Sequence, residues 1–316
     1  MKAMQPAAAV APLVLAVLIA TACSGVGAVA SAPTPSAALP AAPPTAEPPS
    51  ASPAPTPAPS PTPSPTPNWD ERPVAAFEPE GLTQQLITVE TAIRDANVTG
   101  KQLAWYGHLQ QAVYSQLFSS KEWQAQVLAA LPEERAALVG KALDAAQDLR
   151  SLHAGPAPKT LPEWEIVEPR PIEELLSYYK EAEAEFGVPW YYLASIMFVE
   201  TRMGRIRGLS VAGAQGPMQF MPATWAYYGK GDVNDPRDAI MGAARYLRAS
   251  GAPGNMPKAL YAYNHSDFYV DAITKYAELM RDDQSLYRGF HGWNVYYFTQ
   301  DGPVHLPTGW TKEQEE

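Results

Sequence analysis

The chain has 316 residues, a length that allows one to three domains. Its 33 acidic residues outnumber the 23 basic ones, which gives a formal net charge of −10 and a pI near 5.1. This balance excludes a protein that holds nucleic acid through a basic surface, so we expect no nucleic-acid partner.

The first 22 residues have the layout of an export signal. Lys2 precedes an apolar run over Ala7–Ala22, which is short for a membrane span and is interrupted by Pro12. We therefore interpret residues 1–22 as a signal peptide and expect the protein to act outside the cytoplasm.

Cys23 follows this run directly and is the only cysteine of the chain, so it cannot form an intramolecular disulfide. The stretch LIATAC that ends at Cys23 resembles a bacterial lipobox, in which the cysteine is lipidated and becomes the mature N-terminus. An ordinary signal peptide with an incidental cysteine is the alternative, although it would leave an exposed thiol. The lipobox predicts a lipoprotein anchored to the outer face of the cytoplasmic membrane.

Residues 23–68 form a predicted disordered tether behind this anchor. Fifteen prolines lie between Pro33 and Pro67, a stretch with Glu47 as its single charged residue and without an aromatic ring. Such a segment has too little apolar surface to fold and samples extended polyproline geometry. A tether of this kind would let an anchored enzyme reach an insoluble substrate away from the lipid surface.

A first helical block is predicted over residues 69–152. Apolar residues recur there at helical spacing, and Pro132 opens a further helix that runs through Leu149. The block contains no catalytic constellation, and His108 and His153 are too isolated to indicate a metal site. We interpret it as an accessory domain, followed by a proline-rich connector over 153–170.

A second block, residues 171–280, is predicted to consist of short helices joined by glycine and proline loops. The aromatic segment 281–316 is expected to form a small hairpin, and no strand-like alternation occurs earlier, so the predicted fold class is all-α. The residues expected to begin or end helices in the second block are Pro171, Gly187, Pro189, Asp235, Gly251, Pro257 and Ser266.

Glu200 is the residue of this block with the clearest chemical potential. It ends an apolar run, Tyr191–Val199, that predicts a buried helix. Apolar surroundings disfavour the charged carboxylate, so its pKa should rise and keep it protonated near neutral pH, as a general acid requires. A solvent-facing glutamate in the last helical turn is the alternative that spacing alone leaves open.

Several neutral residues of the second block suit a carbohydrate site. Four glycines within thirteen residues would let backbone groups approach a bulky polysaccharide, and metal signatures such as H-E-x-x-H are lacking, so no metal or organic cofactor is implied. The side chains that offer hydrogen-bonding or stacking groups are Gln219, Tyr261, Tyr263 and Asn264.

Separated motifs in this block resemble those of the lytic murein transglycosylases, the lysozyme-like soluble transglycosylase family. They are Glu200-Thr201, SVAGAQG over Ser210–Gly216, Met218-Gln219 and Ala262-Tyr263-Asn264, in the order of the family. The resemblance covers residues 171–280, about a third of the chain. Three departures affect the shape of the cleft: Thr201 where serine is common, Pro217 where leucine is usual, and His265-Ser266 where a glycine is usual.

The resemblance implies that Glu200 is the sole acid and base in cleavage of peptidoglycan between N-acetylmuramic acid and N-acetylglucosamine, with formation of 1,6-anhydromuramic acid. It implies that Ser210 hydrogen-bonds near the reacting sugar and that Tyr263 orients Glu200 or the sugar. The residues it places along the cleft are Met218, Gln219, Tyr263 and Asn264. The alternatives are a hydrolytic lysozyme on the same fold and a non-catalytic lipoprotein that binds the cell wall. No protein partner is indicated.

Overall fold

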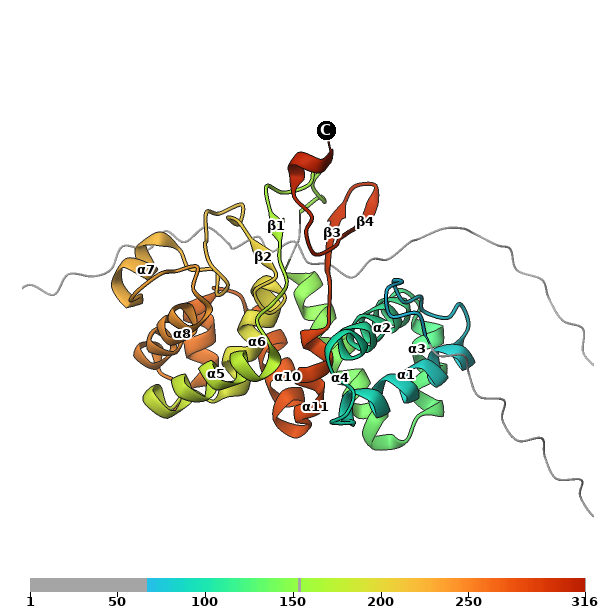
Figure 1. Cartoon of the computed structure of the whole chain (residues 1–316). Coiled ribbons are helices and arrows are strands. Elements are labelled where there is room, and N and C mark those ends of the chain that lie inside the picture. The colour runs from blue at the N-terminus through green and yellow to red at the C-terminus, as the bar shows by residue number, and fades with distance from the viewer. Residues whose placement is uncertain (1–66, 153–154, 316) are drawn as a thin grey trace, which may run out of the picture. The chain divides into compact units, whose positions relative to one another are not determined.

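The computed structural model describes residues 67–152 and 155–315, and Trp69–Glu316 belong to one compact unit. The predicted signal peptide, the lipidation site Cys23 and nearly all of the predicted tether lie outside the described residues. Within the described ranges the structure consists of α-helices with two small two-stranded sheets, which confirms the predicted all-α class (Figure 1). None of the helices described is both long and apolar enough to cross a membrane.

Residues 69–152 form four helices. They are α1 (Pro79–Arg94), α2 (Gly100–Ser119), α3 (Lys121–Ala130) and α4 (Glu133–Ser151). Helix α3 was not predicted separately, because the apolar spacing continues across Ser120. Ser120 ends α2 in an extended conformation, and its hydroxyl accepts a hydrogen bond from the N–H of Trp123, so a new helix begins there.

The second block contains six helices, and most of their ends lie where the sequence predicts them. They are α5 (Ile172–Phe186), α6 (Trp190–Thr201), α7 (Pro222–Tyr228), α8 (Pro236–Ser250), α9 (Met256–Tyr263) and α10 (Asp267–Asp282). Gly187 ends α5 with a left-handed φ of 70°, a conformation that glycine adopts without strain. The carboxylate of Asp235 accepts the N–H of Asp238 and so caps α8.

The C-terminal segment forms the expected hairpin, in which β3 (Val295–Thr299) pairs antiparallel with β4 (Gly302–Leu306). A helix that was not predicted, α11 (Gln284–His291), precedes the hairpin, and the 3-10 helix η1 (Lys312–Glu315) follows it. A second antiparallel pair joins β1 (Glu165–Ile166) in the connector to β2 (Ile206–Arg207), just after α6. The connector is therefore attached to the segment that follows Glu200.

Helix α6 is the central element of the second block. Ten of its twelve residues are buried, and it packs against α5, α8, α10 and α11. Helix α10 in turn packs along α4 of the first block, and Lys141 Nζ lies 2.8 Å from the Glu278 carboxylate across that contact. The apolar side chains of both blocks consequently form one continuous core.

Gly107 allows α2 to approach α11 closely. A Cβ at this position would lie 2.7 Å from Gly292 Cα and even closer to the carbonyl oxygen of Gly289. We expect Gly107→Ala to lower the free energy of unfolding by about 1–3 kcal/mol, because the two backbones must separate. Chemical denaturation monitored by circular dichroism measures this change.

Gly140→Ala is the matched control for this prediction. Gly140 lies within α4, and a Cβ there would meet nothing within 4 Å. Alanine is a better helix former than glycine, so the free energy of unfolding of this variant should rise by about 0.5–1 kcal/mol. Similar changes in both variants would contradict the close α2–α11 contact.

Candidate active site

Glu200 lies near the C-terminal end of helix α6, and the helix places it in the core. The glutamate is the last residue but one of the helix and has an exposed fraction of 0%. The helix stops after Thr201 because Arg202 and Met203 take left-handed φ values of 52° and 61°. The alternative of a solvent-facing Glu200 is therefore wrong.

The two carboxyl oxygens of Glu200 have different surroundings. Tyr269, on α10, donates a hydrogen bond from its hydroxyl to Oε1 at 2.8 Å. Oε2 is buried and has no hydrogen-bond partner among the described residues. Burial raises the pKa of Glu200 to about 8, while the hydrogen bond from Tyr269 acts in the opposite direction. Near neutral pH this carboxyl is mostly protonated, with Oε1 hydrogen-bonded to Tyr269 and the buried Oε2 without a hydrogen-bond partner among the described residues.

Tyr263 makes no hydrogen bond to Glu200, and its predicted alternative role in orienting the sugar stays a prediction. Its hydroxyl donates to the backbone carbonyl of Met218 at 2.6 Å, and its ring lies parallel to that of Tyr269, with centroids 6.4 Å apart. The hydroxyl that reaches Glu200 belongs to Tyr269, which the sequence analysis missed. Tyr269 therefore makes the direct hydrogen bond to Glu200, while the Tyr263 ring lies against that of Tyr269 and its hydroxyl holds the loop that carries Met218.

Thr201 joins the end of α6 to the same loop. Its hydroxyl donates to the backbone carbonyl of Pro217 at 2.6 Å and accepts the N–H of Gly204 at 3.1 Å. These are bonds that a serine hydroxyl also makes, and the acceptor at position 217 is a backbone atom. The departures at Thr201 and Pro217 are therefore compatible with a loop that is tied to the helix beside Glu200.

Ser210 and Gln219 make their hydrogen bonds within the loop. The hydroxyl of Ser210 accepts the N–H of Ala214 at 3.0 Å. Gln219 has a left-handed φ of 50°, and its amide donates to the carbonyl of Gly216 at 3.0 Å. In this structure both residues stabilise the loop. Met218 is linked to the surroundings of Glu200 by the hydrogen bond that its backbone carbonyl accepts from Tyr263.

The remaining predicted residues lie in the last turn of α9 and just after it. Asn264 is buried and ends the helix, and Tyr261 is partly exposed with its ring against His265 at 5.5 Å. No metal-binding cluster of three or more His, Cys, Asp or Glu side chains occurs in the described part of the chain.

A series of tyrosine rings leads from the buried glutamate to the surface, a feature that sequence reasoning also missed. Beyond Tyr263 it continues to Tyr246 at 5.7 Å, then to Tyr228 at 4.8 Å and to Tyr227 at 4.7 Å, measured between centroids. Tyr227 is 80% exposed. Exposed rings of this kind can stack on the apolar faces of sugars, so the series suits a site that binds a polysaccharide.

Comparison with known proteins agrees with the motifs. Residues 177–283 match the family model described as the transglycosylase SLT domain, which confirms the predicted resemblance. The chain is 27% identical over 123 residues to the membrane-bound lytic murein transglycosylase F of Thiobacillus denitrificans. That match covers 36% of this chain and only 26% of the relative. No solved structure matches the chain.

Proposed function

We propose that this protein is a lytic transglycosylase that cleaves the β-1,4 bond between N-acetylmuramic acid and N-acetylglucosamine in peptidoglycan. The observation that carries the proposal is the buried Glu200, with Oε1 held by Tyr269 and Oε2 unpartnered among the described residues. The SLT domain match over 177–283 and the lytic activity named for the relative support it.

Glu200 acts first as the acid in this proposal. Its protonated Oε2 donates to the glycosidic oxygen, the bond from that oxygen to C1 of N-acetylmuramic acid breaks, and the other sugar leaves as an alcohol. The carboxylate that remains keeps the hydrogen bond from Tyr269 on Oε1. A hydrogen bond to an anion is stronger than one to a neutral acid, so Tyr269 stabilises the charge that forms during proton transfer.

Glu200 then acts as the base. The electron-poor C1 is stabilised by the oxygen of the sugar's own N-acetyl group, and the C6 hydroxyl attacks C1 while its proton passes to Glu200. The carboxyl is thereby restored to its starting state, and the product carries a 1,6-anhydro ring. Binding along the cleft is assigned to Ser210, Met218, Gln219, Tyr261, Tyr263 and Asn264.

The pH dependence of cleavage tests the assignment of Glu200. We expect kcat/KM to fall as the pH rises through about 8, because Glu200 loses the proton it must donate. In Tyr269→Phe the carboxylate loses its hydrogen-bond donor, so the pKa should rise further. The falling limb should then move to higher pH by roughly one unit, together with a lower maximal rate. Rate profiles on soluble glycan strands measure both effects.

Tyr263→Phe is the control for this pH shift. It removes the hydrogen bond to Met218 and leaves the one between Tyr269 and Glu200 in place. Its maximal rate is expected to fall while the position of the limb stays the same. A limb that moves to lower pH in Tyr269→Phe would show that the hydroxyl does not stabilise the carboxylate.

We further propose that the protein acts in the cell envelope and is attached to the membrane by lipid on Cys23. The support is the lipobox-like stretch before Cys23 and the membrane-bound character named for the relative. Cys23→Ala should release the protein from the membrane fraction or leave its signal uncleaved. Fractionation and mass analysis of the mature N-terminus distinguish these results. Membrane attachment that persists after normal processing would reject the lipid anchor.

A further inference from the structure

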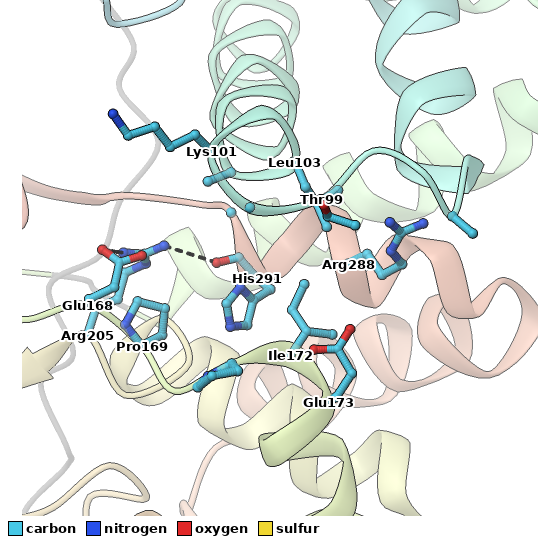
Figure 2. A pocket seen from close by; sticks show the side chains of 15 residues that line it. Thr99, Lys101, Leu103, Glu168, Pro169, Ile172, Glu173, Arg205, Arg288 and His291 are labelled. Carbon is cyan, nitrogen blue, oxygen red and sulfur yellow. Dashed lines mark hydrogen bonds and ion pairs between the residues drawn. The ribbon is translucent and has the colours of Figure 1, made fainter. Parts of the chain in front are cut away.

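A pocket of about 640 Å³ lies outside the residues assigned to the proposed cleft (Figure 2). It is lined by the start of α2, the end of the connector with the start of α5, the segment after α6, and α11. None of the residues assigned above to acid–base chemistry or glycan binding lines it. Its volume lies within the range of roughly 300–1,000 Å³ that is usual for sites of small organic ligands.

Arg205 contributes a buried and incompletely compensated cation to this pocket. It is 4% exposed, and its Nε has no hydrogen-bond partner among the described residues. One terminal nitrogen donates to the carbonyl of His291, as Figure 2 shows, and the other lies 3.6 Å from Glu168 Oε2. The Glu168 side chain is 69% exposed, so water screens its charge. A buried guanidinium with a free donor favours an anion beside it.

Two helix N-termini reach the same pocket. Thr99 precedes α2 and Pro171 precedes α5, and neither makes a side-chain cap hydrogen bond. The first N–H groups of both helices are thus left for other acceptors, and the helix dipoles add positive potential. Both Thr99 and Pro171 line the pocket. Together with Arg205, they make this region suited to a carboxylate.

Further cations lie around the pocket. Lys101, in the first turn of α2, is exposed, and its Nζ donates to Asp70 Oδ1 at 2.7 Å, so a ligand would share this ammonium with Asp70. Arg288 is held from α11 by the carbonyls of Ile93, Asp95 and Val98, which carry no full charge. Burial lowers the pKa of His291 to about 4, so this ring is neutral at physiological pH.

The pocket also offers two carboxylates and an apolar lining. Glu168 and Glu173 are the acids, and the apolar part of the lining includes Ala96, Leu103 and Ile172. A simple inorganic anion would not bind favourably to these carboxylates or to the apolar side chains. A ligand with carboxylate, amino and small apolar groups would contact all of them.

We propose that this pocket binds a short acidic peptide with free carboxylate and amino groups and small side chains. Peptidoglycan carries peptides of this class, so the proposal deepens the proposed function, and its link to peptidoglycan rests on that function. The backbone carbonyl of Arg205 accepts the N–H of Val167 at 2.8 Å, and Arg205 follows Glu200 by only five residues. A bound peptide would therefore contact the segment that leads out of the helix bearing the proposed acid.

The test is calorimetric titration of the full-length protein with a synthetic tripeptide of alanine, glutamate and lysine with free ends. We expect saturable binding that Lys101→Glu weakens by roughly fivefold, because an attraction becomes a repulsion at an exposed site that water partly screens. Lys121→Glu makes the same charge change at an exposed site on α3 outside the pocket and should alter the affinity less than twofold. The same tripeptide with acetylated amines and amidated carboxyls should not bind.

Three outcomes would overturn the peptide site: no saturable binding, equal binding of the blocked peptide, or equal weakening by both lysine variants. Displacement of the tripeptide by an equal concentration of inorganic phosphate would also overturn it, in favour of a simple anion site. Glu200→Gln should bind the tripeptide with unchanged affinity. Because binding is measured without cleavage, a failure of the transglycosylase proposal and a failure of the pocket give separate results.

Discussion

Glu200→Gln should bind peptidoglycan and cleave it about 10²–10⁴-fold more slowly than the wild type. The amide is nearly isosteric with the carboxyl but cannot donate a proton as an acid does. Because the pKa of Glu200 is about 8, the wild-type side chain is already mostly neutral at pH 7, so a neutral amide adds little desolvation cost. Tyr269 can still donate to the amide oxygen. Turbidity of purified sacculi reports cleavage, co-sedimentation reports binding, and thermal unfolding reports stability.

Asp267→Asn is the matched change of an acid to its amide. Asp267 follows the Ala262-Tyr263-Asn264 motif, lies in the first turn of α10 and is exposed. Loss of this charge at the helix N-terminus should lower the free energy of unfolding by a few tenths of a kcal/mol and leave the cleavage rate nearly unchanged. Substantial residual cleavage by a folded Glu200→Gln variant would remove Glu200 from the role of acid.

The parts of the fold that were predictable from the sequence depend on local chemistry. Gly187 ends α5 because it accepts a left-handed φ, and Asp235 begins α8 because its carboxylate caps the helix. The run Tyr191–Val199 has no polar face, so a helix there had to be buried on all sides. Spacing alone left the burial of Glu200 open, and its 0% exposure and raised pKa come from the helices that pack around α6.

The parts that were not predictable depend on contacts between distant segments. Tyr269 and Glu200 are 69 residues apart, and only the packing of α10 against α6 brings the tyrosine hydroxyl to the carboxyl. The spacing of α10 shows which of its residues are buried but not which of them face the glutamate. The pocket at Arg205 depends likewise on the position of α11, a helix within the segment that the sequence predicted only as a hairpin.

The number of carboxyl groups around Glu200 bears on whether the reaction closes an anhydro ring or adds water. Most glycosidases use two carboxyl groups, about 5–5.5 Å apart in retaining enzymes and ~6.5–9.5 Å apart in inverting ones. Within the described residues, burial and Tyr269 account for the shifted pKa of Glu200, and no carboxylate contributes. The acids that could activate water are Asp232 and Asp267. Asp232 accepts the N–H of Asn234 at 2.9 Å in its own turn, and Asp267 is exposed in the first turn of α10.

Digestion of purified sacculi should therefore give mainly muropeptides with 1,6-anhydromuramic ends, each lighter by one water than the hydrolysis product. Among the described residues no carboxylate contributes to the pKa of Glu200, so we expect the C6 hydroxyl of the same sugar, rather than an activated water, to attack C1. Its attack is intramolecular, and a well-oriented intramolecular group can match an effective concentration of about 10⁵–10⁸ M, far above that of water. Mass spectrometry of the released fragments, without reduction, separates the two products. Mainly reducing muramic ends would instead identify a hydrolytic lysozyme, and Asp232→Asn and Asp267→Asn would then show which acid activates the water.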